Sequence, residues 1–425
     1  MKVCFILVAG LDQALLAHTP GLKTLVSPPH RTTFRPPLPA VTSTVQATLT
    51  TGSAPSAHGI IANGLFTHNR PDLHPHLDLS SFPDFRQNIS FWEQADSLLQ
   101  RPRFWEPHRA AGKKIAMLFW QNSMPGTGAP SADIILTPQP THTPDGITLT
   151  ACWSHPADLY ASLTAKLGPF PLHHYWGPMA GLPSSQWIIN AAMETWTTQN
   201  LDLQLVYIPH MDYNLQRQGP GTSGTGVPPV VLQDLLALDA ALAPLVALVR
   251  STGGTPIICG DYAITPVSRC IMPNRIFREA GLLQTTPDAA GKLLIDYDRS
   301  AAVAMVDHQI AHIYTQVAAT PTGASAPLLA MLRRTPGIAQ VAATPEEKRS
   351  LGLDSPRSGD IIAIAEHDTW FAHDWWLDDS EKPAWQFSVD IHRKPGYDPR
   401  ELFADPVKRI ILQDTGVVKG SHGAV

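Results

Sequence analysis

The chain is poor in cysteine. Its 425 residues include four cysteines, Cys4, Cys152, Cys259 and Cys270, and no two of them show Cys-x-x-Cys spacing. Two of them lie in apolar, strand-like runs, where free cysteine behaves as a small hydrophobic residue. The sequence therefore indicates neither a zinc finger nor a disulfide framework.

Charge is also scarce, and basic charge is not in excess. Asp, Glu, Lys and Arg make up 16% of the residues, and the formal net charge is −5. The chain thus lacks the basic footprint of a nucleic-acid-binding protein, so we expect no nucleic-acid partner. A small anionic ligand would need a local source of positive charge, such as a bound metal ion.

Long hydrophobic runs are absent as well. No apolar stretch approaches the ~18 residues that cross a bilayer, so we expect no membrane partner. The apolar run at residues 2–8 is too short for a signal peptide and is typical of a first core strand. We therefore expect a cytoplasmic protein, and the sequence does not set its oligomeric state.

Apolar runs that alternate with helical stretches predict the fold. The runs are at residues 2–8, 114–120, 201–208 and 255–260. This alternation predicts an α/β fold whose mainly parallel sheet carries helices on both faces. Ligands in such folds bind at the carboxyl ends of the strands. Asp212 and Asp261 each follow one of these runs and are therefore candidate site residues.

The same pattern predicts a core and a smaller cap. Residues 230–250 are typical of one long amphipathic helix, which Pro244 should kink or shorten. Residues 265–385 carry their own alternation of short helices and strands, and we assign them to the cap. The predicted core comprises residues 1–264 and 386–425.

The most informative motif lies near the N-terminus. It contains Thr42 in Pro-Ala-Val-Thr-Ser-Thr, then Thr51-Gly52, then His58-Gly59-Ile60-Ile61-Ala62-Asn63. A hydroxyl at a sheet edge, a tight turn into a helix and a later amide would hold phosphorus between a nucleophile and a charge-stabilising donor. Taken singly, such a threonine is typical of a strand or a helix cap, and Asn63-Gly64 of a turn. Together they favour phosphoryl transfer.

This motif resembles the nucleotide pyrophosphatase/phosphodiesterase branch of the alkaline phosphatase superfamily. The resemblance implies an alkaline phosphatase-like core in which Thr42 is the nucleophile and Asn63 holds an oxygen of the transferred phosphate. Over nearly its whole length, the chain also resembles a bacterial branch of phosphodiesterases with altered metal ligands. Matching segments of that branch include residues 39–42, 170–172, 208–212 and 390–399.

Members of this family hold two divalent metal ions, and the resemblance implies a metal site with changed ligands. The family's first Asp-Gly reads Ala9-Gly10 here, and two of its histidines are replaced by Gln216 and Tyr262. Asp212 and Asp261 keep two of the family's carboxylates. We therefore expect fewer than two tightly bound ions, namely one zinc or manganese ion.

Four histidines are candidate replacement ligands. His308 and His312 stand four residues apart, which places them on one face of either a helix or a strand. Hydrogen-bonded core or surface histidines would show the same spacing, so both interpretations stay open. The family's late histidine matches either His392, in Asp-Ile-His-Arg-Lys-Pro-Gly-Tyr-Asp, or His422, in Gly-Ser-His-Gly.

The resemblance predicts metal-dependent hydrolysis of a phosphodiester or pyrophosphate bond through Thr42. The substrate would be a small phosphorylated metabolite, bound by Gln216, Tyr262 and Trp176. One alternative is a protein that binds such a metabolite with little or no turnover. Another is a phosphatase that acts on a sugar or cyclitol phosphate.

Overall fold

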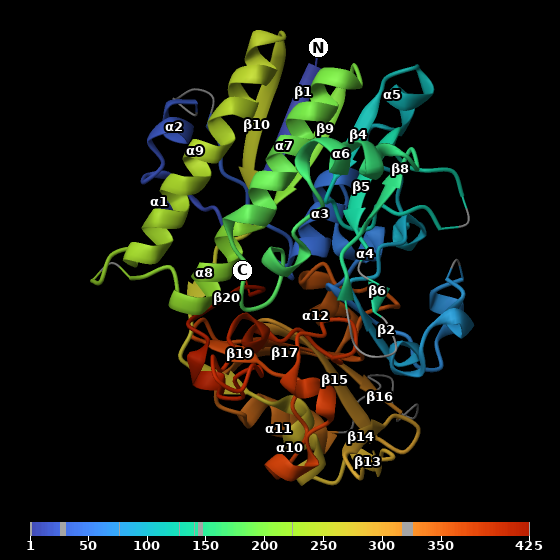
Figure 1. Ribbon diagram of the computed structural model, residues 1–425. Helices are drawn as coiled ribbons and strands as arrows, with labels where there is room; N and C mark the ends of the chain where they lie inside the picture. Colours follow the sequence, from blue (N-terminus) through green and yellow to red (C-terminus); the bar gives the residue numbers. More distant parts are fainter. Residues whose placement is uncertain are drawn as a thin grey trace. The chain divides into compact units, whose positions relative to one another are not determined.

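The chain forms two compact units in its computed structural model (Figure 1). Unit 1 comprises residues 1–35, 49–52 and 94–264, and unit 2 comprises residues 36–48, 53–93 and 265–425. The structure describes residues 2–25, 31–75, 77–126, 128–139, 141–142, 148–222, 224–316 and 326–424.

The division differs from the predicted core and cap. Residues 386–425, predicted to join the core, belong to unit 2 together with residues 265–385. Contacts within unit 2 explain this grouping, because β20 (Gly420–Ser421) pairs with β11 (Thr265–Pro266) at the start of the predicted cap. Most of the segment from 36 to 93 also belongs to unit 2.

Unit 1 is built on a six-stranded sheet in the order β10-β1-β9-β4-β5-β8. Its strands are β1 (Lys2–Val8), β4 (Ile115–Leu118), β5 (Ile134–Pro138), β8 (Cys152–His155), β9 (Leu203–Ile208) and β10 (Gly254–Gly260). All neighbouring pairs are parallel except β5 and β8. The predicted α/β fold with a mainly parallel sheet is therefore confirmed. Each of the four predicted apolar runs contains a strand of this sheet.

The two longest helices of unit 1 pack on this sheet. α7 (Leu182–Thr198) contacts β9, and α9 (Pro229–Ser251) contacts β10 and α7. The other helices are α1 (Gln13–Leu16), α2 (Pro20–Leu25), α5 (Glu106–Ala110), α6 (Leu159–Leu167) and α8 (His210–Gln218), and a short strand pair joins β6 (Thr141–His142) to β7 (Thr148–Leu149). α9 continues through Pro244, so the predicted shortening of this helix is wrong.

α9 is the one described helix that is long and apolar enough, by length and composition, to cross a bilayer. This finding differs from the expectation that no apolar stretch of the sequence is long enough to cross a bilayer. Within unit 1, its Leu235, Leu238, Leu242 and Leu245 side chains are buried. This burial is what a core helix packed on a sheet requires.

Unit 2 contains a four-stranded antiparallel sheet in the order β15-β16-β18-β17. These strands are β15 (Ala302–Asp307), β16 (Ile310–Thr315), β17 (Ile338–Ala342) and β18 (Ile361–Ala365). The smaller strands are β2 (Gly64–Phe66), β3 (Ile89–Phe91), β12 (Arg269–Ile271), β13 (Gln284–Pro287), β14 (Leu293–Asp296) and β19 (Thr369–Phe371). The helices are α4 (Pro55–His58), α10 (Pro273–Glu279), α11 (Ala326–Arg334) and α12 (Pro345–Ser350). α3 (Thr42–Thr51) begins in unit 2, and its last turn belongs to unit 1.

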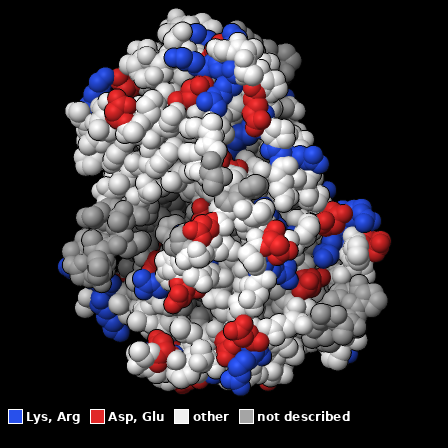
Figure 2. Space-filling view, turned by 90° about the vertical axis from the view of Figure 1, so that its right-hand side faces the viewer, with Lys and Arg blue, Asp and Glu red and all other residues white. Residues whose placement is uncertain are grey.

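Acidic and basic side chains are interspersed on the face of the molecule shown in Figure 2. Neither sign of charge forms a continuous stripe on this face. The picture agrees with the low net charge of −5, and it gives no indication of a surface built for the phosphate backbone of a nucleic acid.

Unit 2 also holds a buried network of ion pairs. Arg400 donates to the two carboxylate oxygens of Asp374 at 2.8 and 2.6 Å, and its Nε donates to Asp398 at 2.7 Å. Lys394 pairs with Glu401 at 2.8 Å. These five side chains are at most 3% exposed. Buried charges are tolerated only when they are paired, so the network fixes this part of the chain.

We predict that Asp374→Ala lowers the free energy of unfolding by about 3–5 kcal/mol, because the buried Arg400 loses a partner for its charge. Asp368→Ala is the control. Asp368 pairs with Arg269 at 3.2 Å, but these side chains are 44% and 48% exposed, and such pairs contribute at most about 1 kcal/mol. Urea denaturation followed by circular dichroism measures both variants. Equal losses would contradict a special role for the buried network.

Candidate active site

Thr42 is the first residue of α3. The predicted position at a sheet edge is therefore wrong, and the helix-cap alternative is closer to what is observed. The next residue, Ser43, donates its backbone N–H to Asn63 Oδ1 at 2.9 Å. Asn63 thus caps the first turn of the helix that carries Thr42. The N–H groups at a helix N-terminus carry partial positive charge, which favours an anion at this end.

Two glycines set the chain path between Thr42 and Asn63. α3 ends at Thr51 and is followed by Gly52 at φ +64°, and α4 ends at His58 and is followed by Gly59 at φ +79°. Left-handed conformations at helix ends favour glycine, which has no Cβ to clash. The Thr-Gly and His-Gly pairs of the motif are therefore helix stops, which bring Asn63 back to the start of α3.

Asp307, at the end of β15, organises the residues around Asn63. Its Oδ2 accepts the backbone N–H of Asn63 at 2.7 Å, and its Oδ1 accepts Asn63 Nδ2 at 3.2 Å. Oδ1 also lies 2.7 Å from Nδ1 of His308. The carboxylate is fully buried, and this burial raises its pKa to about 6, while the hydrogen bonds from Asn63 oppose the rise.

His308 occupies the two-residue turn between β15 and β16 at φ +60°. Glycine is the usual residue at such a position, and a non-glycine side chain there stores strain of about 1–3 kcal/mol. The imidazole is held between two rings, with ring centroids 3.6 Å from Tyr397 and 3.7 Å from His422. A strained backbone that places one buried ring indicates that the position of this ring matters for function.

The hydrogen-bond partners of His308 and His422 assign their tautomers. Nδ1 of His308 faces the Asp307 carboxylate, and Nδ1 of His422 lies 2.7 Å from the Ala40 carbonyl oxygen. Both partners are acceptors, so Nδ1 carries the proton and Nε2 carries the lone pair in each ring. Burial lowers the pKa of both imidazoles well below the usual value, which keeps both rings neutral.

His312 and His392 do not join this group. In His312, Nε2 lies 3.1 Å from the Ile61 carbonyl oxygen and Nδ1 accepts the Gly359 N–H at 3.2 Å. Both ring nitrogens are thus used by the backbone, which leaves no lone pair of His312 for the predicted metal. His392 is half-buried, with Nδ1 3.4 Å from the Phe91 carbonyl oxygen. Of the two late histidines, His422 is the one that stacks on His308.

In unit 1, Asp212 lies in the first turn of α8, directly after β9. Its Oδ2 accepts Gln216 Nε2 at 2.6 Å, and its Oδ1 accepts the Tyr262 hydroxyl at 3.2 Å. Gln216 and Tyr262 are therefore buried partners of Asp212, and their contact with substrate stays a prediction. Each oxygen of Asp212 accepts one of these hydrogen bonds and keeps a further lone pair, so its role as a metal ligand also stays a prediction.

Asp261 follows β10 and binds the start of the chain segment after β1. Its Oδ1 accepts the N–H groups of Gly10 and Tyr262 at 2.9 and 2.8 Å. Its Oδ2 is buried and has no hydrogen-bond partner among the residues that the structure describes. Asp261 therefore offers one oxygen for the predicted metal. Trp176, predicted to bind substrate, is half-buried near Tyr213, and its role stays a prediction.

The burial of Asp212 should make the stability of the folded protein depend on pH. Burial raises the pKa of Asp212 from 3.8 to about 7, so between pH 4 and 7 the folded state holds a proton that the unfolded state releases. Raising the pH through this window destabilises the wild-type protein through this group. We predict that Asp212→Asn gains stability relative to wild type by up to about 1.4 kcal/mol per pH unit there. Denaturant titrations at pH 5, 6, 7 and 8 measure this trend. A difference between variant and wild type that stays constant across this range would show that Asp212 is already ionised, as it would be beside a bound cation.

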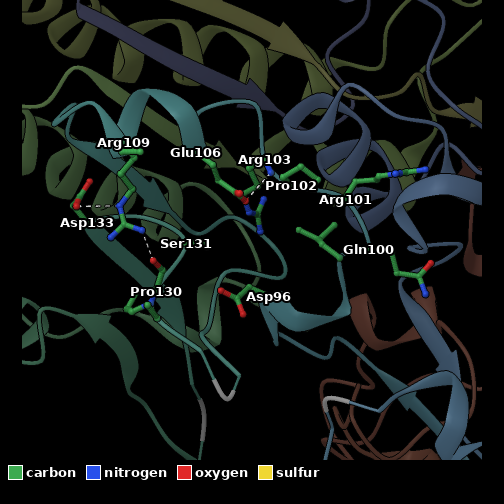
Figure 3. Close-up of a pocket in the computed structure, with 13 residues that line it drawn as sticks. Asp96, Gln100, Arg101, Pro102, Arg103, Glu106, Arg109, Pro130, Ser131 and Asp133 are labelled. Atoms are coloured by element: carbon green, nitrogen blue, oxygen red, sulfur yellow. Dashed lines mark hydrogen bonds and ion pairs between the residues drawn. The ribbon is translucent and has the colours of Figure 1, made fainter.

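A polar cavity of about 870 Å³ in unit 1 contains none of the predicted site residues. Its charged side chains interact with one another, as Figure 3 shows for Arg109, which is turned towards Asp133 at 3.1 Å. Glu106 in turn accepts the backbone N–H of Arg103 at 2.9 Å. Because acidic side chains line the cavity beside its arginines, it does not resemble a site for phosphoryl groups.

Sequence reasoning misses Asp307, Tyr397 and Ser43 as members of the group around Thr42. Asp307 is 244 residues from Asn63 in the chain, so no local spacing connects them. An acidic residue directly before His308 is the one signal that could have indicated a carboxylate–histidine pair.

The atoms that have a lone pair available for a metal ion indicate which residues could hold one. His308 and His422 donate Nδ1–H to an acceptor and keep a lone pair on Nε2, which is the usual arrangement of metal-ligating histidines. Nε2 of His308 is buried and has no hydrogen-bond partner in the described part of the chain. No group of three or more His, Cys, Asp or Glu side chains suited to a metal occurs among the described residues. By this chemistry, His308 and His422 are candidate metal ligands, and the number of bound ions stays a prediction.

Comparisons with known proteins show the family and the fold of the chain. A family model described as type I phosphodiesterase / nucleotide pyrophosphatase matches residues 3–398. No curated protein sequence matches the chain. Phosphonoacetate hydrolase from Sinorhizobium meliloti 1021, solved with phosphonoacetate, is similar at a TM-score of 0.57 and 16% identity, over 88% of this chain and 83% of that chain. Murine ectonucleotide pyrophosphatase / phosphodiesterase 5, solved as an inactive variant with AMP, is similar at a TM-score of 0.55 and 14% identity, over 99% and 88%.

The two structures share the fold, and the family model covers nearly the whole chain. The family hydrolyses phosphoric esters and generally depends on divalent metals. The resemblance predicted from the Thr42–Asn63 motif and the predicted enzyme class, a phosphoric ester hydrolase, are therefore confirmed. The chain belongs to the type I phosphodiesterase/nucleotide pyrophosphatase family.

Proposed function

We propose that the protein hydrolyses a phosphodiester or pyrophosphate bond in a small phosphorylated metabolite, with Thr42 as the nucleophile. The observation that carries this proposal is the grouping at the N-terminus of α3. There, Asn63 caps the helix that begins with Thr42, and Asp307 holds both Asn63 and His308. A hydroxyl at this end of a helix lies where a phosphate is favoured.

Asn63 has the capacity to bind a phosphate oxygen while it caps the helix. Its Oδ1 accepts the Ser43 N–H, and one hydrogen of its Nδ2 is donated to Asp307. An amide nitrogen carries a second hydrogen, which is available to an oxygen of the substrate. Because Asp307 and Ser43 fix the amide plane, this donor is oriented before the substrate binds, as charge stabilisation in the transition state requires.

The reaction proceeds in two displacements at phosphorus. In the first, Thr42 Oγ1 forms a bond to phosphorus, the bond to the leaving oxygen breaks, and the hydroxyl proton is transferred to the leaving group. In the second, water attacks the phosphorus of the Thr42 ester. This step restores the hydroxyl and releases the phosphorylated product.

His308 and His422 are the residues that would hold one divalent ion, zinc or manganese. When bound, such an ion neutralises phosphoryl charge and lowers the pKa of a nearby hydroxyl. Asp307 keeps the His308 ring in the required tautomer, and the Ala40 carbonyl does the same for His422. One ion supplies less positive charge than two, so a monoanionic diester suits the site better than a dianionic monoester.

The similar proteins support a small phosphorus-containing substrate. The murine structure holds AMP and is inactive because of a threonine-to-alanine substitution, and the Sinorhizobium structure holds phosphonoacetate. Both ligands are small anions, as expected for this chain. Binding without turnover, or hydrolysis of a sugar or cyclitol phosphate, are the alternatives that the experiments below distinguish.

We predict that Thr42→Ala lowers kcat/KM for an aryl phosphodiester at least about 1,000-fold, which corresponds to about 4 kcal/mol in the transition state. The substitution removes the atom that attacks phosphorus. Thr44→Ala, two residues further along the same helix, is the matched control and should keep activity. Retained activity in Thr42→Ala with loss in Thr44→Ala would place the nucleophile at Thr44. No diesterase activity in the wild type, together with tight binding or monoester turnover, would support one of the alternatives.

We predict that His308→Asn removes the bound metal, whereas His312→Asn does not. Asparagine tolerates the positive φ at position 308 but lacks the imidazole Nε2. His312→Asn instead breaks buried hydrogen bonds to the backbone, which should lower the unfolding free energy by about 1–3 kcal/mol. Elemental analysis of the purified variants, with wild type expected near one equivalent, checks the stoichiometry. Equal metal loss in both variants, or two full equivalents in the wild type, would refute the assignment.

A further inference from the structure

Unit 1 contains a second cavity, of about 430 Å³, whose walls are mainly apolar. The walls include Phe5, Phe104, Trp105, Trp120, Leu205 and Ile257. The lining as a whole comes from β1, β9 and β10, from β4 and the residues after it, from the last turn of α3 and from the segment around α5. The volume and the aromatic lining are typical of pockets that enclose small molecules, which range from about 300 to 1,000 Å³.

The aromatic walls are held in place by contacts outside the cavity. Trp105 is fully buried and donates its Nε1–H to the Ser131 carbonyl oxygen at 3.0 Å. The Arg103 guanidinium lies 5.4 Å from the centre of the Trp105 ring, and Figure 3 shows Arg103 and Ser131 in the neighbouring polar cavity. Phe104 is fixed by a backbone hydrogen bond to Thr50 at 2.8 Å. The cavity is therefore preformed.

The cavity leaves apolar surface exposed. Phe104 is 51% exposed and Ile257 is 42% exposed, although both are large apolar side chains at its walls. Covering such surface is favourable by about 25 cal/mol per Å². A ligand with an apolar body would cover these two side chains.

The ionisable residues of the cavity favour an anionic head group. They are Lys113, His108 and Asp202. Asp202 is already satisfied, because its Oδ1 accepts Lys113 Nζ at 3.1 Å and its Oδ2 accepts the Lys114 N–H at 3.0 Å. Lys113 has three donor hydrogens and uses one of them on Asp202. The exposed Lys113 and His108 are thus left to bind a carboxylate.

We propose that this cavity binds a small amphipathic carboxylate, with its apolar chain against the aromatic walls and its carboxylate at Lys113. The cavity is a separate site from the carboxylates at the end of the sheet. Ile257 and Asp261 are four residues apart along β10 and its continuation, which is about 13 Å in an extended strand. The proposal does not depend on hydrolysis by Thr42.

Isothermal titration with decanoate tests the apolar part of the site. We expect saturable binding of one molecule per chain to the wild-type protein, and at least ten-fold weaker binding to Ile257→Gln. Leu236→Gln is the matched control, because Leu236 is 46% exposed, belongs to α9 of the same unit and does not line the cavity. This variant should bind like wild type. If circular dichroism shows that Ile257→Gln does not fold, Phe104→Ser repeats the test at another exposed residue of the cavity wall.

The head group is tested by comparing decanoate with decanol. Lys113→Ala should weaken the binding of decanoate about ten-fold and leave that of decanol unchanged. Lys166→Ala is the control, since Lys166 is 57% exposed and ion-paired, much as Lys113 is at 53%, but lies outside the cavity. Absence of saturable binding, or equal weakening in variant and control, would overturn the proposal. So would a wild-type dimer that Ile257→Gln dissociates, because the apolar surface would then be an interface between two copies.

Discussion

The buried carboxylate of Asp307 is the interaction on which the candidate site depends. A carboxylate out of contact with water is stable only when donors satisfy its oxygens. Here the donors are the backbone and the amide of Asn63 and the ring of His308. The need to satisfy one buried charge therefore places the residue that caps the Thr42 helix beside the ring that carries an available lone pair. Ordinary packing would fix none of these groups in orientation.

Asp212 is also a buried carboxyl group, but its hydrogen-bond partners differ from those of Asp307. Its oxygens accept hydrogen bonds from an amide and a phenol, both neutral, and desolvation outweighs the opposing effect of the Arg217 charge. Burial then shifts the balance towards the protonated form. Gln216 and Tyr262 thus form a hydrogen-bond network that satisfies the carboxyl group of Asp212.

Sequence reasoning succeeds here where the signal is local. The inner strands β4 and β9 of the parallel sheet are buried on both faces, so each appears in the sequence as a continuous apolar run. The motif from Thr42 to Asn63 is also local, because its helices end at Gly52 and Gly59. Such reasoning fails where a contact joins distant segments, as for Asp307 and Asn63. Sequence reasoning also fails where a turn interrupts the regular alternation of side chains along a strand. His308 sits at φ +60° in the turn and His312 on β16, so the rule that residues i and i+4 share a face does not hold for this pair.

α3 combines two of the features described above in one short helix. Thr42 is its first residue, and Leu49 and Thr50, near its end, line the apolar cavity. In a helix, inserting or deleting one residue rotates one end against the other by about 100° and shifts it by about 1.5 Å. The length of α3 is therefore not free to vary, since any change would turn Thr42 away from its partners or withdraw the side chains that close the cavity. Natural or engineered length variation in this part of the chain should fall after Gly52, where the helix has already ended.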